Sequence, residues 1–222
     1  MGLADVLLMK MLRWLLVAVC LLKAIDALQF DHALALAWLV GLASLAAHER
    51  YGSWTLALIT LGGAALDLPR MSNHVVLVGW IGLILAFWGD QRTRLKLLRI
   101  QACVVYFFAG LSKINPRFLT GEVIAERQSW LPLPQVLAVT AIAAEWALCV
   151  MVWCRWRWTI PIAAVFHAAL VIGWTTDFLG HGPGILTFNV LVFAIVAVVV
   201  HGSPEISAPV VQCELEKDPP LP

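Results

Sequence analysis

Apolar stretches alternate with short polar breaks along most of the chain. The apolar runs fall at residues 12–28, 32–48, 53–68, 74–89, 97–114, 134–154, 158–178 and 184–201. Most are slightly shorter than the roughly 20 residues with which a helix crosses a bilayer, and two are about that long. Charged or turn-forming residues separate the runs, as in His48-Glu49-Arg50. This pattern predicts eight helices, or seven if the second and third runs form a broken hairpin.

The composition indicates where these helices reside. Of the 222 residues, 61% are hydrophobic and 13% are charged, and the mean hydropathy is +0.86. Soluble domains carry about 25% charged residues, so a water-soluble protein of this size could not cover so much apolar surface. We expect an all-α polytopic membrane helix bundle, with a transmembrane domain over residues 1–201 and a disordered tail over residues 202–222. The net charge of +1 gives no electrostatic reason to expect a nucleic acid partner.

The distribution of lysine and arginine predicts the orientation. With the N-terminus inside, ten of these residues fall at cytoplasmic helix ends and five at outer ends. The tightest basic cluster lies in residues 90–99. Cytoplasmic ends carry the excess of positive charge in membrane proteins. Both termini are therefore expected in the cytoplasm, with residues 115–130 on the outer face.

The segment VVYFFAGLSKINP, residues 104–116, ends an apolar run on Lys113 and an Asn-Pro step. His74 lies 16 residues before Asp90, and Lys113 lies 16 residues after Leu97. A helix of that length rises roughly 24 Å, so both side chains are expected at a similar depth on the outer side. Adjacent helix axes lie about 8–10 Å apart, close enough for a lysine and an imidazole to face each other across a cavity.

Two interpretations of Lys113 stay open on these grounds. An interfacial lysine can extend its ammonium to water beside Arg117. A lysine desolvated inside the bundle can instead lose its proton and act as a general base.

Three further polar residues lie deep in predicted helices. Glu145 is near the middle of the sixth run and His167 is nine residues into the seventh. A carboxylate at that depth is costly unless it is paired or protonated. We therefore expect Glu145 and His167 to meet, either as a structural hydrogen bond or as part of a proton path. Asn189 in the eighth run is expected to bond to another helix.

Several chemistries are disfavoured by what the sequence lacks. The five cysteines include no CxxC pair, which argues against a disulfide-exchange enzyme. No HxxxH or HxxHH cluster is present to bind di-iron. A bis-histidine haem would lack its second ligand, because His167 is the only deep histidine. We expect no metal cofactor.

Two motifs resemble a known family. The stretches SNHVVLVGWIGLILAFWGD and LLRIQACVVYFFAGLSKINPRFLTGEVI resemble the membrane core of vitamin K-dependent gamma-carboxylase and its bacterial relatives, the HTTM (horizontally transferred transmembrane) family. That family has Asn-His at the start of one helix, and a later helix of the type vYf.aGl.Kl that ends on a lysine. VFHAALVIGWTTDF is similar to a later histidine-bearing helix. The resemblance covers roughly residues 10–201, and Phe118 stands where the family has a tryptophan.

The resemblance implies a mechanism. Lys113 would be the base that deprotonates a reduced quinone of the vitamin K or menaquinol type, and His74 would be its oxyanion or proton partner. Oxygen would be a co-substrate, and CO2 a further one if carboxylation occurs. The residues expected around the quinone are Asn73, Tyr106, Glu145 and His167. The implied location is a bacterial inner membrane, with the site facing outside.

Two classes of function follow. The first is a membrane enzyme that uses a reduced quinone, oxygen and a lysine base. The carboxylase binds its glutamyl substrate in a large lumenal domain after the membrane core, whereas this chain ends in a short tail. Oxygen chemistry on a small substrate is therefore better supported than peptide carboxylation. The second class is a non-catalytic membrane protein that binds a lipid, a peptide or a partner in export or immunity. A buried lysine favours the first class and a solvated lysine favours the second.

Overall fold

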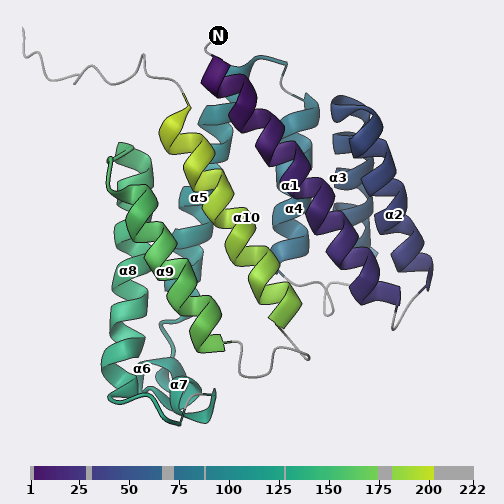
Figure 1. Ribbon diagram of the computed structural model, residues 1–222. Helices are drawn as coiled ribbons and strands as arrows, with labels where there is room; N and C mark the ends of the chain where they lie inside the picture. The colour runs from purple at the N-terminus through teal and green to yellow at the C-terminus, as the bar shows by residue number, and fades with distance from the viewer. Residues whose placement is uncertain are drawn as a thin grey trace, which may run out of the picture.

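The computed structural model describes residues 3–28, 32–66, 73–87, 89–127, 129–174 and 182–202, and within these ranges the chain is an all-helical bundle (Figure 1). The long helices are α1 (Leu3–Leu28), α2 (His32–Ala47), α3 (Glu49–Leu66), α4 (Asn73–Phe87), α5 (Gln91–Ser112), α8 (Pro134–Cys154), α9 (Thr159–Trp174) and α10 (Gly182–His201). Two short helices, α6 (Pro116–Leu119) and α7 (Glu122–Arg127), lie between α5 and α8. The tail predicted to be disordered falls almost entirely outside the described residues.

Each predicted apolar run corresponds to one long helix. Helices α2 and α3 are separate helices that pack against each other. Only His48 lies between them. Within the described ranges, two helices, α5 and α8, are long and apolar enough to cross a membrane, judged by length and composition.

Helix α5 begins at Gln91, six residues before the apolar run that predicted it. Its N-cap is Asp90, whose carboxylate accepts a hydrogen bond from the Thr93 amide at 2.8 Å. This cap satisfies an amide that would otherwise lack a partner in the first turn. The hydrogen bonds from Thr93 hold the pKa of Asp90 below its usual value. The polar first turns of α5 are therefore helical despite their low hydropathy.

Helix α10 is at the centre of the bundle. It packs against α1 and α9, and also contacts α5, α4 and α8 (Figure 1). Helices α1 to α4 pack in chain order, each on the next or the previous one, and α5 packs mainly on α8. One continuous apolar core includes side chains from all eight long helices. The first and last described residues lie at the same end of the bundle (Figure 1).

Helices α4 and α5 are joined by a short connection but touch each other only sparsely. The two helices are therefore not close neighbours along their length. Helix α3 is the main partner of α4, and α10 contacts both α4 and α5. Residues 73 and 74 form the start of α4, but the side chains of Asn73 and His74 lie outside the described part of the structure. Their predicted approach to Lys113 stays a prediction.

The short helices α6 and α7 form a compact unit beneath α8 (Figure 1). Asn115 begins α6, and its side chain accepts a hydrogen bond from the Phe118 amide at 3.0 Å. Gly121 joins the two short helices with a φ of 77°, and a Cβ there would lie 2.5 Å from the Gln135 amide nitrogen. A second small apolar cluster holds the unit to α8, and it consists of Phe118, Ile124, Ala138 and Ile142.

Candidate functional site

Lys113 is the residue at which α5 ends, and its side chain turns back into the bundle. The ammonium nitrogen Nζ donates to Glu145 Oε1 at 2.7 Å and to the Ala109 carbonyl at 3.1 Å. The Lys113 side chain is 21% exposed and the Glu145 side chain only 5%. The Phe118 ring lies 5.9 Å from Nζ. The lysine is therefore held in a largely apolar site and not extended to water.

The packing of α5 on α8 brings Glu145 to this position. The two helices run antiparallel, and the thiols of Cys103 and Cys149 each donate to the other residue's carbonyl, at 3.5 and 3.4 Å. Closer to Lys113, Trp146 Nε1 donates to the Phe107 carbonyl at 3.4 Å. The first turns of α8 pack on α6 and α7. For this reason Glu145, eleven residues into α8, lies level with the end of α5.

The interfacial interpretation of Lys113 is not what the structure shows. Arg117, the group beside which Lys113 would have met water, forms its own exposed ion pairs with Glu126 at 2.8 Å and Glu122 at 3.4 Å. Lys113 instead pairs with a buried carboxylate. Two ion pairs four residues apart in the chain therefore occupy very different surroundings.

A second polar chain crosses the interior from α5 to α10. The Tyr106 hydroxyl lies 2.7 Å from His167 Nε2, and His167 Nδ1 lies 2.6 Å from Asn189 Oδ1. All three residues are buried. An amide oxygen can only accept, so Nδ1 carries a proton and donates to Asn189. In the neutral tautomer, Nε2 accepts from the Tyr106 hydroxyl.

The predicted hydrogen bond between Glu145 and His167 is wrong. Both side chains are buried as expected, but each has other partners. Both ring nitrogens of His167 are occupied, by Tyr106 and Asn189, and Glu145 binds Lys113. An ammonium compensates a buried carboxylate better than a neutral imidazole does. The expectation that Asn189 bonds another helix is confirmed.

The sequence contains a signal that could have identified the Lys113–Glu145 pair. Glu145 is the most buried carboxylate that the structure describes, and such a group requires a cation nearby. Lys113 is the cation closest to it along an antiparallel helix pair. Tyr106 and His167, expected around a quinone, are hydrogen-bonded to each other, and their contact with a quinone stays a prediction.

One atom of the site has no partner among the described residues. Glu145 Oε2 is buried and accepts no hydrogen bond from them. A buried acceptor left unsatisfied costs about 1–3 kcal/mol. The pair is thus ready to accept one further hydrogen bond from a donor such as a hydroxyl group. Among the described residues there is no group of three His, Cys, Asp or Glu side chains that could hold a metal ion.

Comparisons of the chain with protein-family models, with curated proteins and with solved structures found no match.

Proposed function

We propose that this chain is a polytopic membrane enzyme of the HTTM type, in which Lys113 and Glu145 move a proton for oxygen-dependent oxidation of a reduced quinone, with or without carboxylation. The observation that carries the proposal is the Lys113–Glu145 pair. A lysine that served only as an anchor would extend to water. This one is held on a buried carboxylate at 2.7 Å.

In the proposed topology all eight long helices cross the bilayer. Both chain termini lie in the cytoplasm, and the end of the bundle that contains Lys113 faces outside. Support comes from the outer surface of the bundle. Large apolar side chains are exposed on many of the helices, including Leu58 on α3, Val150 on α8 and Val165 on α9. A soluble protein rarely exposes such extensive apolar surface, whereas lipid solvates it.

The residues at the Lys113 end fit a reduced quinone. The unpaired Oε2 atom of Glu145 offers an acceptor to a hydroxyl group. Phe118 lies beside the ammonium, and Leu111 and Ile114, two residues before Lys113 and one after it, are exposed apolar residues. A quinone ring with an isoprenoid tail needs this combination of one polar contact and apolar walls. From the resemblance, His74 would add a proton or oxyanion partner and Asn73 would support it.

Proton transfer within the pair would prepare the base. A reduced quinone, when bound, supplies an acidic hydroxyl and the electrons that oxygen accepts. Lys113 must first lose a proton, and Glu145 Oε1 is the nearest acceptor. Moving that proton from Nζ to Oε1 converts an ammonium and a carboxylate into an amine and an acid with no change in net charge. A low-dielectric site tolerates this neutral form. Nζ can then accept the hydroxyl proton.

Lys113→Arg tests the proposal, because a guanidinium keeps the charge and the ion pair but is not deprotonated in proteins. We expect quinol-dependent oxygen uptake by membranes containing the variant to fall by at least about 100-fold. Oxygen uptake by the Lys113→Ala variant should fall similarly and recover in part when small amines are added. Arg117→Lys, which changes an exposed cation four residues away, should retain activity.

An active Lys113→Arg protein would overturn the catalytic role of the lysine. Wild-type membranes that consume no more oxygen than control membranes, with menaquinol and with vitamin K hydroquinone, would overturn the enzyme proposal. The non-catalytic membrane protein, binding a lipid, a peptide or a partner, would then be the better explanation.

A further inference from the structure

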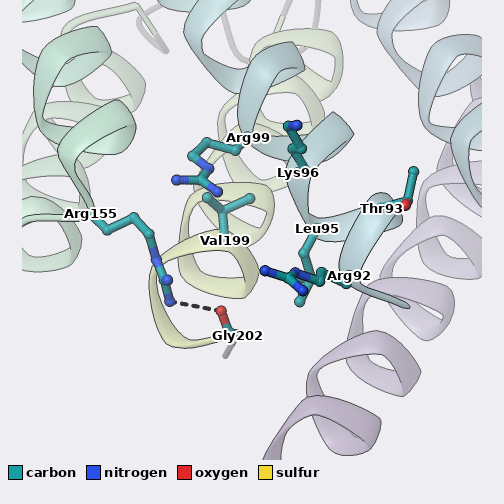
Figure 2. A pocket seen from close by; sticks show the side chains of 8 residues that line it. All are labelled: Arg92, Thr93, Leu95, Lys96, Arg99, Arg155, Val199 and Gly202. Atoms are coloured by element: carbon teal, nitrogen blue, oxygen red, sulfur yellow. Dashed lines mark hydrogen bonds between the residues drawn. The ribbon is translucent and has the colours of Figure 1, made fainter. Parts of the chain in front are cut away.

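A basic cavity of about 370 Å³ lies at the opposite end of α5 from Lys113 (Figure 2). Four cationic side chains line it, together with Thr93 and apolar groups: Arg92, Lys96, Arg99 and Arg155. No carboxylate occurs among its described lining residues. The cavity brings together the start of α5, the end of α8 and the end of α10.

Three of these cations project from one face of α5. Arg92, Lys96 and Arg99 are spaced by four and then three residues, which places them on adjacent turns of the same face. In the part of the chain that the structure describes, none of them has a carboxylate partner. Arg94, within the same two turns, faces elsewhere and pairs with Glu49 at 2.9 Å. The helix therefore directs one arginine to an acid and three cations to the cavity.

Arg155 completes the cavity from the other side (Figure 2). It ends α8 with a φ of 53°, a left-handed conformation that glycine or asparagine usually occupies at this position. Its guanidinium donates to the Gly202 carbonyl at 2.7 Å, at the end of α10. Burial and the nearby charge of Arg99 hold the pKa of Arg155 below its usual value. The protein thus maintains several like charges around one space.

We propose that this cavity is a binding site for a phosphate group, carried either by an anionic lipid or by free phosphate. Guanidinium groups present planar pairs of N–H donors that match phosphate oxygens, and lysine adds a further charge. The Thr93 hydroxyl lies in the same lining. A bound phosphate would neutralise the repulsion among the four cations.

Membrane topology alone does not account for this arrangement. The excess of positive charge at cytoplasmic helix ends requires only that the residues be present on that side. It does not require cations from two separate segments to converge on one cavity, or a left-handed backbone at Arg155. Arg50 and Arg157, which are also exposed, satisfy the topological rule without lining the cavity.

The phosphate site is independent of the proposed enzyme activity. Residues 92 and 113 are 21 positions apart on one helix and its cap, which corresponds to about 31 Å along the axis. Phosphate binding at the cavity can therefore be measured separately from the enzyme activity. It can also be abolished by substitution without changing the Lys113–Glu145 pair.

The test uses the full chain purified in a neutral detergent, with its thermal unfolding followed by tryptophan fluorescence. A ligand that binds the folded state raises the unfolding midpoint. The probes are inorganic phosphate, short-chain phosphatidylglycerol and short-chain phosphatidylcholine, each at matched ionic strength. We expect the midpoint to rise with one or both anionic probes and not with phosphatidylcholine. A rise with phosphatidylglycerol alone identifies a lipid headgroup, and a rise with both identifies phosphate itself as the ligand.

Arg99→Gln and Arg157→Gln form a matched pair, because each removes one arginine at the same end of the bundle. We expect Arg99→Gln to raise the half-maximal concentration of the anion by roughly tenfold, the effect of losing a charge-assisted contact. Arg157→Gln should leave it unchanged. Equal effects of the two substitutions would overturn the proposal, since they would indicate non-specific attraction. No midpoint change with either anionic probe would overturn it as well.

Discussion

Two ion pairs near the end of α5 have similar geometry and opposite surroundings. Lys113 and Glu145 are 2.7 Å apart with side chains 21% and 5% exposed. Arg117 and Glu126 are 2.8 Å apart with side chains 62% and 53% exposed. A list of distances would treat them as equivalent. Because Glu145 is buried, the first pair contains a desolvated charge, whereas both charges of the second pair are largely solvated.

The comparison shows how burial distinguishes two ion pairs of similar length. Solvent competes for every hydrogen bond of the Arg117 pair, so little is lost when that pair opens. Glu145 has no such alternative, whereas the Lys113 side chain keeps 21% exposure. The buried carboxylate therefore depends on the ammonium for compensation of its charge.

The largest effect is expected when the buried pair is broken on one side. Lys113→Met leaves the Glu145 carboxylate buried with neither oxygen paired, and Glu145→Leu leaves the ammonium with only the Ala109 carbonyl as acceptor. Breaking a buried pair costs about 3–5 kcal/mol, and we expect about 3 kcal/mol because Lys113 keeps some exposure. The free energy of unfolding in detergent, from denaturant titration, is the measurement.

The double variant Lys113→Met with Glu145→Leu sharpens the same test. Replacing both members of a buried pair by apolar residues is often neutral or stabilising. We expect the double variant to unfold close to the wild type, which gives a large coupling energy in the double-mutant cycle. Additive losses would mean that the two residues do not act as a buried pair.

A smaller effect is expected from the packing that sets the position of Glu145. A Cβ at Gly110 would lie 2.6 Å from Trp146 Nε1. Gly110→Ala therefore displaces the Trp146 indole from the Phe107 carbonyl. Trp146 directly follows Glu145 in the chain, so this displacement also disturbs the position of Glu145. We expect a loss of about 1–2 kcal/mol in unfolding free energy.

Gly62→Ala is the matched control for that substitution. Gly62 is also helical, in α3, and a Cβ there meets nothing within 4 Å. Alanine is favoured over glycine in helix interiors by about 1 kcal/mol, so Gly62→Ala should be neutral or stabilising. A destabilised Gly62→Ala protein, or an unaffected Gly110→Ala protein, would contradict the close packing of α5 on α8.

The number and order of the long helices could be predicted from the sequence, because each apolar run is bounded by charges or turn residues. The start of α5 could not be predicted from hydropathy, because its first turns carry Arg92, Arg94 and Lys96. Only the Asp90 cap marks the boundary, and it acts through one hydrogen bond.

The candidate site was predictable in part. Burial of Glu145 and His167 follows from their positions in apolar helices. Their partners depend on helix packing that no local pattern encodes. The unit formed by α6 and α7 lies beneath α8 and thereby sets Glu145 level with Lys113. Helices α4 and α5 are consecutive but touch sparsely, and α10, which is distant in the sequence, contacts both of them.

The smallest effect is expected for Arg117→Gln. Both members of the exposed pair are solvated, and ion pairs of this kind contribute little to stability. Glu126 and Glu122 hold the pKa of Arg117 above its already high usual value. A raised pKa stabilises the fold below the unfolded-state pKa, and that contribution is lost only as the pH rises through the folded-state value. The arginine therefore stays charged across the neutral range, and no pH dependence should appear there.

At about 0.1 M salt the screening length is about 10 Å, which weakens the pair further. We expect the unfolding free energy of Arg117→Gln to match the wild type at moderate salt. A loss as large as that of Lys113→Met would show that exposure does not separate the two pairs.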